Sequence, residues 1–456
     1  MNFQKDTLYL VPLGGCGEFG GNLMLYGWNG KWLMLDCGIG FNRHHLLPQL
    51  NLQILMPDPA FIASQKENLL GCVITHAHED HVGAVPYLWD LLQCPVYMSP
   101  FAARIMAERA FELGKDIHPH LVYPDDVIEL GPFSCRMLSV THSVPEAMMI
   151  AIKTPVGTII HTGDWKLDPD PLVGELTNEA ALKQFGEQGV LAVVGDSTNA
   201  QVAGTSGSES TVRDGLTKLF GTLDQRIVVS MMSRNLCRIQ AIAEAAYAND
   251  REVSLVGRSL WTAESIGRDL GYFADLPAFI SPKKIMRLPR DRMVLIATGT
   301  QGESNAALTR MADNEHPFIR IERNDTVVYS SRVIPGNEAA VNEVHQKFTN
   351  RGVRIITREY PDIYVSGHPC AEEMKRVYGW LKPRYVIPVH GEPEQQQAHA
   401  KLAEGLGHQT LVPQNGNVMQ VGAETLAVVG QVPTGHLALR NIEGEDSARY
   451  TLERFN

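Results

Sequence analysis

The sequence is poor in the features that mark secreted or membrane proteins. Its seven cysteines are scattered among 456 residues without a Cys-x-x-Cys pair, which argues against a disulfide framework and against a zinc ribbon. No apolar run approaches the roughly 18 residues that a membrane helix needs, and the stretch "MNFQKDTLYLVPLGG" does not have the pattern of a signal peptide. We therefore expect a cytoplasmic protein without membrane association, in which most cysteines are buried small hydrophobes.

Positive charge is also scarce. The 40 Lys and Arg residues are outnumbered by 51 Asp and Glu residues, and the net charge is −11. Because non-specific nucleic-acid binding comes mainly from neutralising phosphates, this charge argues against gross affinity for nucleic acid, but not against a local basic groove. Hydrophobic residues make up 44% of the chain and charged residues 20%, as in an ordinary globular protein. The length predicts two or three domains.

The order of the predicted elements divides the chain into three segments. Residues 1–205 contain short strands, such as "TLYLVPL", "GCVITH" and "LAVVGDS", with helices between them. In residues 206–350 strands alternate with amphipathic helices, as where "RIVVSMM" precedes "LCRIQAIAEAAYAND". This alternation predicts a parallel sheet covered by helices. Residues 351–456 include "PRYVIPVHGE" and "HAKLAEGLG" and end in short strands.

The stretch "GGCGEFGG" matches the spacing of a dinucleotide-binding fingerprint, with Gly15, Gly17 and Gly20 after a strand and Asp36 downstream. That fingerprint must open a helix, whose N-terminus holds the pyrophosphate. Here the residues that follow, "NLMLYGWNGKWLMLD", have the pattern of two strands around a turn. A tight loop between strands is therefore the favoured interpretation.

Three histidines and two acids crowd into "HAHEDH", residues 76–81, directly after an apolar strand. In an extended chain alternate residues share one face, so His76 and His78 can point to the same ion. Asp80 and His81 lie at the turn into the next helix and can face a second ion. Imidazole and carboxylate ligands suit zinc or manganese, and the lack of thiolates favours a catalytic site over a structural one.

Further candidate ligands lie at the ends of other apolar strands. His142 lies in "SVTHSVPEA", Asp164 in "IIHTGDWK" and His390 in "YVIPVHGE". A lone histidine at a strand end is usually structural, but four sites of the same kind favour shared ligation. Asp36 ends "WLMLD" and is a candidate for orienting a ligand histidine from behind.

These motifs resemble those of a known enzyme family. "THAHEDH" together with Asp36, His142 and Asp164 resembles the metallo-β-lactamase fold, an α/β protein with an αββα sandwich. The central region looks like the inserted β-CASP domain, a Rossmann-like parallel α/β unit, with "GDSTNA", "VSGHP" and "PVHGE" in the places of its marker motifs. "TGTQGE" and "IPGNE" add to the likeness. From about residue 8 to 410 the chain resembles the bacterial ribonuclease J family.

The resemblance implies a two-metal site that hydrolyses the phosphodiester bonds of RNA. His76, His78 and His142 would hold one divalent ion, Asp80, His81 and His390 would hold the other, and Asp164 would bridge the two. Zinc is the expected metal, and manganese is the alternative. The ions would activate a nucleophile that attacks phosphorus in line. Asp80, Asp196 and His368 would be the catalytic groups, with His368 over the scissile phosphate.

Contacts with RNA are expected from two short stretches. Arg234, Asn235 and Arg238 open a helix near the predicted junction between the domains. The resemblance adds Ser366, Gly367 and His368, in "VSGHP". The basic stretch "SPKKIMRLPRDR" is either a further phosphate contact or a solvated surface.

The chain departs from the family pattern at several positions. The family usually has His where this chain has Cys237, and Ala-Ser where it has Pro369 and Cys370. A thiol is a weaker hydrogen-bond donor than a hydroxyl, so recognition of the RNA 5′ phosphate is expected to be altered. The usual C-terminal domain, tied to oligomer assembly, is expected to be lacking after Asn456, and a homodimer is left open.

Three functions are compatible with the sequence. The leading hypothesis is a 5′-to-3′ exonuclease, with endonuclease activity as an option, that acts on single-stranded RNA in RNA processing and decay. The second is a nuclease that prefers DNA, or a hydrolase of another phosphodiester, because no contact to the 2′-hydroxyl can be identified. The third is an RNA-binding subunit without metals, which the complete ligand set disfavours.

Overall fold

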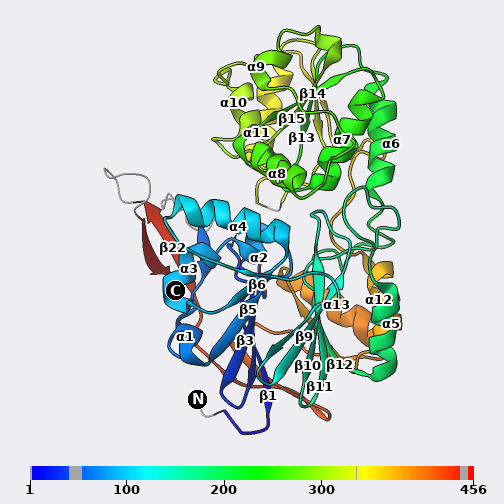
Figure 1. The fold of residues 1–456 in the computed structure, drawn as a ribbon. Coiled ribbons are helices and arrows are strands. Elements are labelled where there is room, and N and C mark those ends of the chain that lie inside the picture. Colours follow the sequence, from blue (N-terminus) through cyan, green and yellow to red (C-terminus); the bar gives the residue numbers. More distant parts are fainter. Residues whose placement is uncertain (1–2, 41–53, 335, 442–449, 456) are drawn as a thin grey trace.

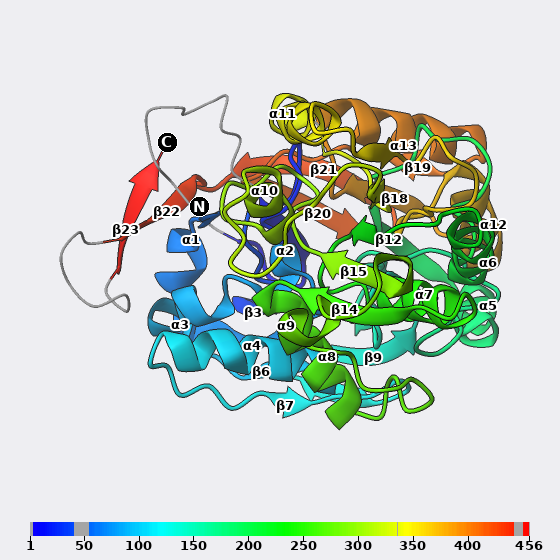
Figure 2. The ribbon, with the colours of Figure 1, turned by 90° about the horizontal axis from the view of Figure 1, so that it is seen from above.

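The computed structural model describes residues 3–40, 54–334, 336–441 and 450–455, and these form two lobes (Figure 1). The lower lobe consists of two large sheets with helices on their outer faces, and the upper lobe is an insertion built on a five-stranded sheet. Seen from above, the insertion lies over the lower lobe (Figure 2). The predicted αββα sandwich with an inserted α/β domain is confirmed.

The central strands of the first sheet of the lower lobe are buried on both faces. In spatial order its strands are Thr425–Gln431 (β21), Asn417–Gly422 (β20), Leu8–Gly14 (β1), Leu23–Trp28 (β2), Lys31–Leu35 (β3), Leu69–Val73 (β5), Val96–Met98 (β6) and His120–Leu121 (β7). The pleat of β1 sends Leu8 and Leu10 into the core between the sheets, and Tyr9 and Val11 toward the outer helices. Those helices are Ala60–Ala63 (α1), Glu79–Val82 (α2), Val85–Leu92 (α3) and Pro100–Glu112 (α4), with a 3-10 turn at Lys66–Asn68.

The second sheet packs on the first and carries three helices on its other face. Its strands, in spatial order, are Gln409–Thr410 (β19), Tyr385–Val389 (β18), Val190–Asp196 (β12), Gly157–His161 (β11), Met148–Thr154 (β10), Phe133–Ser139 (β9) and Val127–Leu130 (β8). The helices are Glu179–Gln188 (α5), Ala371–Leu381 (α12) and Pro393–Gly405 (α13). Val193 of β12 shares a buried cluster with Leu182 and Met374 of these helices.

The insertion is the alternating strand-and-helix unit that the sequence predicted. Its strands, all parallel, are Glu252–Val256 (β14), Met293–Ala297 (β15), Ile227–Ser230 (β13), Thr326–Tyr329 (β16) and Arg354–Ile356 (β17). Its helices are Glu209–Phe220 (α6), Leu236–Tyr247 (α7), Arg258–Asp269 (α8), Pro282–Ile285 (α9), Ala307–Ala312 (α10) and Glu338–Thr349 (α11), with a 3-10 turn at Arg290–Arg292. Because β17 pairs with β16, this sheet extends past residue 350, where the sequence placed the domain boundary.

A third sheet joins Tyr450–Phe455 (β23), His436–Asn441 (β22) and Leu55–Pro57 (β4).

Other features of the structure agree with the sequence analysis. All seven cysteines are buried and free of disulfides. Within the described residues, every helix is too short or too polar to span a bilayer. The glycine-rich stretch after β1 leads into β2 rather than into a helix, as predicted.

Parallel strands bring distant residues of the lower lobe to one edge. β9, β11, β12 and β18 run in the same direction within the second sheet, and β3 and β5 do so within the first. Each of these strands ends at, or shortly before, a predicted site residue: His142, Asp164, Asp196, His390, Asp36 and His76. The carboxyl ends of parallel strands are where ligands bind in open α/β sheets.

Candidate metal centre

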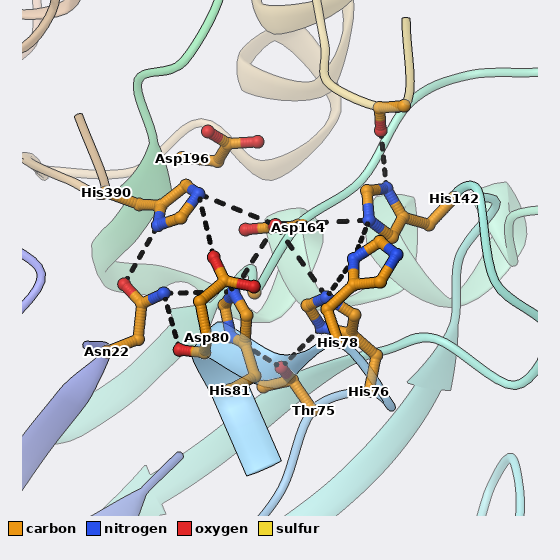
Figure 3. Close-up of polar contacts among 12 residues, drawn as sticks. Asn22, Thr75, His76, His78, Asp80, His81, His142, Asp164, Asp196 and His390 are labelled. Atoms are coloured by element: carbon orange, nitrogen blue, oxygen red, sulfur yellow. Dashed lines mark hydrogen bonds and ion pairs between the residues drawn. The ribbon is translucent and has the colours of Figure 1, made fainter. Parts of the chain in front are cut away.

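Seven predicted ligands meet at this edge of the lower lobe (Figure 3). The ligand atoms of His76, His78, His142 and Asp164 lie within 4.8 Å of one another, and so do those of Asp80, His81, Asp164 and His390. Asp164 belongs to both groups, as expected of a bridging carboxylate. The structure thus brings together the two sets of residues that the sequence proposed.

The first group fits one divalent cation. Nδ1 of His78 lies 3.1 Å from Nε2 of His76 and 3.0 Å from Nε2 of His142. Neutral ring nitrogens that approach so closely repel each other unless a proton or a cation lies between their lone pairs. Nitrogens that bind one zinc ion in a tetrahedron are about 3.3 Å apart, so both of these separations are close to the required spacing.

The carboxylate of Asp164 lies at the centre of the cluster. Its Oδ2 atom is between 3.3 and 3.9 Å from one nitrogen of each of His81, His390, His76, His368 and His142. Its Oδ1 atom is buried and has no hydrogen-bond partner. A buried carboxylate oxygen without a partner is costly, so this atom also fits the role of a cation ligand.

The outward-facing ring nitrogens of the five ligand histidines all have partners. These are Thr75 for His76 (3.0 Å), Ser143 for His78 (3.2 Å), Asp36 for His81 (2.7 Å), the carbonyl of Gly367 for His142 (2.5 Å) and Asn22 for His390 (2.9 Å). Each contact orients its ring, and an N–H that donates outward leaves the opposite nitrogen with its lone pair toward the centre.

Burial keeps the histidines of the first group neutral. It lowers the pKa of His76 and His78 well below the usual value for histidine, and it lowers the pKa of His142 to about 3. Neutral imidazole is the form that binds a metal. Burial also acts to lower the pKa of His81, but the carboxylates of Asp164 and Asp36 outweigh it and raise that pKa. The second group therefore attracts positive charge, as a divalent-cation site must.

Asp36 lies behind the second group, where the sequence placed it. Its Oδ2 accepts the hydrogen bond from Nδ1 of His81, and its Oδ1 accepts one from the backbone N–H of Thr75 at 2.8 Å. Asp36 and His390 both have left-handed backbones, with φ of 60° and 51°. Such conformations cost on the order of 1–3 kcal/mol in a non-glycine residue and persist where the surroundings hold them, often at functional sites.

His368 and Asp196 form a pair beside the ligands. Nδ1–H of His368 donates to Oδ2 of Asp196 at 2.8 Å. Burial acts to lower the pKa of His368, but Asp196 and Asp164 outweigh it and raise the pKa to about 9 in the metal-free protein. Its side chain is 23% exposed, so a bound molecule can reach it.

Of the expected RNA contacts in the insertion, Arg234 and Asn235 have structural partners. Arg234 donates to the carbonyl of Ala77 at 2.7 Å and pairs with Glu79, so it ties the insertion to the loop that carries His78. The side chain of Arg234 is still 19% exposed. Oδ1 of Asn235 caps α7 by accepting from a backbone N–H of the first turn. Contact of either residue with RNA remains a prediction.

Arg238, the third expected RNA contact of the insertion, is buried and has only protein partners in the described structure. Its guanidinium is only 1% exposed and forms two hydrogen bonds with Glu209, at 2.8 and 2.9 Å. It also donates to Ser330 and to the carbonyl of Val365. Because α7 is buried around most of its circumference, position 238 faces protein rather than solvent. The apolar sequence of this helix was the signal that could have shown it.

The segment between β17 and α12, which leads from the insertion back to the lower lobe, shapes the site through Ser366 and Gly367. Oγ of Ser366 accepts from Nδ2 of Asn199 at 2.7 Å and from the backbone N–H of His368 at 3.1 Å. A Cβ on Gly367 would lie 2.9 Å from Cε1 of His142, so a larger residue would displace that ligand. Both residues therefore position neighbouring side chains, and their contact with substrate remains a prediction.

In the basic stretch 281–292, one cation has a structural role. Arg290 pairs with Asp325 and Glu322 of the insertion. The other four, Lys283, Lys284, Arg287 and Arg292, are exposed. Contact of these four exposed side chains with phosphates stays a prediction.

Sequence reasoning missed four residues that contact the site. Thr75 and Ser143 adjoin His76 and His142 in the chain, so a polar neighbour of a ligand was an available signal. Asn22 and Asn199 are distant in sequence from the residues that they contact, and no local pattern marks them.

Three family models match the chain in succession. Residues 16–207 match the metallo-beta-lactamase superfamily. Residues 224–348 match a domain described as "Ribonuclease J, beta-CASP domain", and residues 353–413 match a "Zn-dependent metallo-hydrolase RNA specificity domain".

Curated relatives cover nearly the whole chain. Ribonuclease J of Sinorhizobium meliloti is 41% identical over 446 residues, which are 95% of this chain and 78% of that protein. The ribonuclease J of Mycolicibacterium smegmatis is 36% identical over 98% of this chain and 80% of its own length. That of Helicobacter pylori is 34% identical over 95% of this chain, which spans 63% of that protein. Among solved structures, a protein of unknown function from Enterococcus faecalis V583 has the same fold, with a TM-score of 0.61 at 15% identity, over 91% of this chain and 100% of that one.

Proposed function

The chain belongs to the ribonuclease J family and is a metal-dependent ribonuclease of the metallo-β-lactamase fold, and from this premise we propose that it hydrolyses single-stranded RNA with two divalent ions, one in each ligand group. The observation that carries the proposal is the convergence of six side chains on the carboxylate of Asp164. A metal-free RNA-binding subunit would have no need for five oriented imidazoles, four of which are buried.

The ligand assignment follows the two groups. His76, His78 and His142 would hold one ion, Asp80, His81 and His390 would hold the other, and Asp164 would belong to both groups. When bound, such ions supply a nucleophile at neutral pH and neutralise charge that develops on the phosphate. The nitrogen-rich donor set suits zinc, and manganese accepts the same ligands.

His368 is the proposed contact to the reacting phosphate. Its Nδ1 is engaged by Asp196, which leaves Nε2–H to donate to a phosphate oxygen or to the leaving 3′ oxygen. A hydrogen bond between a cation and a phosphate is about twice as strong as a neutral one. Asp196 orients the ring and raises its pKa, which favours the protonated form that has this donor.

A single strand is the substrate that suits this geometry. The side chains of His76, His81 and Asp164 are at most 2% exposed. A reacting phosphate must therefore enter as a narrow strand, since a rigid duplex cannot bring its backbone so deep. Arg234 joins the insertion to the ligand loop, so both lobes border this entry.

The proposed activity is tested by comparing substrates with the metal-loaded enzyme. Labelled single-stranded RNAs with a 5′ monophosphate, a 5′ triphosphate and a 5′ hydroxyl are incubated beside matched DNA and duplex RNA. We expect cleavage of single-stranded RNA, with products that distinguish stepwise from internal cuts. Equal cleavage of the DNA, or none of any RNA, would contradict the proposal.

The role of His368 gives a separate prediction. His368→Ala is expected to lower turnover by about 10²-fold or more, because a preorganised donor to the developing charge is lost. Metal content, measured on the purified protein, is expected to stay at the wild-type value, since Nδ1 of His368 is bound to Asp196. His118→Ala, at a histidine that is 86% exposed, is the control. Loss of metal from His368→Ala would instead make His368 a ligand.

A further inference from the structure

The loop between β1 and β2 ends at Asn22, a side chain that is 9% exposed and lies against the second ligand group (Figure 3). This loop is the glycine-rich stretch whose spacing matches a dinucleotide fingerprint, and it binds no pyrophosphate at a helix, because no helix follows it. Its role in the molecule therefore needs another explanation.

The amide of Asn22 contacts every ligand of the second group except the shared Asp164. Oδ1 accepts the hydrogen bond from Nδ1–H of His390 at 2.9 Å. Nδ2 donates to the backbone carbonyl of Asp80 at 3.0 Å. It also lies 3.0 Å from Nε2 of His81, the nitrogen that faces the ion site, so a bound ion would replace this second contact. The structure gives Asn22 no hydrogen bond to His76, His78 or His142, so its contacts are confined to one of the two groups.

The glycines of the loop make these contacts feasible. Gly15 has φ of 85°, and a Cβ at this position would lie 2.4 Å from Oδ1 of Asn22. The carbonyl of the same Gly15 accepts from the backbone N–H of His390 at 2.8 Å. Asn22 is fixed in turn, because its own backbone N–H donates to Asp80 and its carbonyl accepts from Gly38. The loop thus holds both the backbone and the ring of His390.

We propose that Asn22 is a positioning residue for the second metal ion: it fixes the tautomer and direction of His390 and holds the Asp80–His81 turn against it. The inference rests on the proposed two-ion site. A ligand histidine binds well when its outward nitrogen donates to a fixed acceptor, and loss of such a partner typically weakens metal binding 10- to 100-fold. Because the contacts are confined to one group, only one of the two binding steps should weaken.

Titration of the metal-free protein with Mn²⁺ tests this inference. Native mass spectrometry counts the bound ions, and the electron paramagnetic resonance signal of two coupled manganese ions reports the second. For Asn22→Ala we expect one binding step to keep the wild-type affinity and the other to weaken 10- to 100-fold. Asn22→Asp keeps an oxygen that accepts from His390, so it should bind the second ion at least about tenfold more tightly than Asn22→Ala. Should alanine destabilise the loop, Asn22→Ser takes its place, since its hydroxyl is too short to reach His390.

Asn415→Ala is the matched control. Asn415 braces the same loop from its other side, where Oδ1 accepts from Cys16 at 3.0 Å and Nδ2 donates to Glu18 at 2.7 Å, and it contacts no ligand. We expect it to bind both ions with wild-type affinity. Equal weakening of both steps in Asn22→Ala, or unchanged binding, overturns the inference while the two-ion site stands. A wild-type protein that binds fewer than two ions would instead contradict the proposed function.

Discussion

Replacing Asp164 with alanine is expected to reduce cleavage of a labelled single-stranded RNA by at least about 10³-fold. The shared carboxylate is the one group common to both ligand sets, and its Oδ2 lies between 3.3 and 3.9 Å from five imidazole nitrogens. Its removal takes one ligand from each proposed ion and removes the negative charge that offsets two cations. Loss of a single preorganised electrostatic contact already costs 10²–10³ in turnover, so loss of a ligand to both ions should cost more.

The same variant should remain folded. Oδ1 of Asp164 has no hydrogen-bond partner, and the contacts of Oδ2 are confined to the site. Single-turnover cleavage and metal content are measured together with the far-ultraviolet circular dichroism spectrum. Asp170→Ala, an exposed acid six positions further along the chain, serves as the control and should cleave normally. Cleavage by Asp164→Ala at the wild-type rate would refute the metal assignment.

Replacing Arg238 with methionine is expected to lower the free energy of unfolding by about 3–5 kcal/mol. The substitution keeps an apolar chain of similar length but leaves the carboxylate of Glu209, which is 2% exposed, without its cation. It also removes the hydrogen bonds to Ser330, just after β16, and to Val365, in the segment that returns to the lower lobe. Through these bonds Arg238 connects both segments to α6, which carries Glu209. Urea denaturation of the metal-free protein measures the loss.

Two companion variants separate charge burial from other effects. Arg238→Met combined with Glu209→Leu should recover much of the lost stability, because a buried ion pair can be replaced by apolar residues at little cost. Arg104→Met removes an ion pair whose side chains are 49% and 54% exposed, and it should cost under about 1 kcal/mol. Were Arg238 an RNA contact instead, Arg238→Met would bind RNA more weakly with unchanged stability.

The ion pair of Arg238 and Glu209 also predicts that the free energy of unfolding depends on pH. Burial acts to raise the pKa of Glu209, but Arg238 outweighs it and holds the pKa below the usual value. The stability from this depressed pKa is complete above the unfolded-state pKa and is lost as the pH falls through the folded-state value. As the pH falls, the wild type should therefore lose the stability that comes from ionised Glu209. The double variant Arg238→Met, Glu209→Leu lacks this carboxylate, so its stability should not fall for this reason.

Much of the metal centre could be predicted because its signals are local. An acid or a histidine that closely follows an apolar strand must lie near the carboxyl end of that strand. Parallel strands of one sheet end at the same edge, so such residues come close together. His76, Asp164 and His390 all follow this rule, so their meeting is a consequence of the strand pattern. The alternation of strands and helices in the insertion likewise predicted a parallel sheet, and the structure confirms it.

The roles of polar residues on the lobes' inner surfaces could not be predicted in the same way. Arg234 and Arg238 lie four positions apart, yet one is partly exposed and the other is buried against Glu209. Asn22 contacts His390 across 368 positions of sequence, and its amide carries no pattern of its own. The environment of such a side chain depends on which distant segment packs over it.

The sequence by itself determined the fold class, the family and the chemical types of the metal ligands, because apolar periodicity and short motifs act over a few residues. Only the tertiary structure decided that Asn22 contacts His390, that Asp196 hydrogen-bonds to His368 and orients it, and that Arg238 is buried. Those outcomes depend on burial and on the nearest opposite charge, and both are set by contacts between segments hundreds of residues apart.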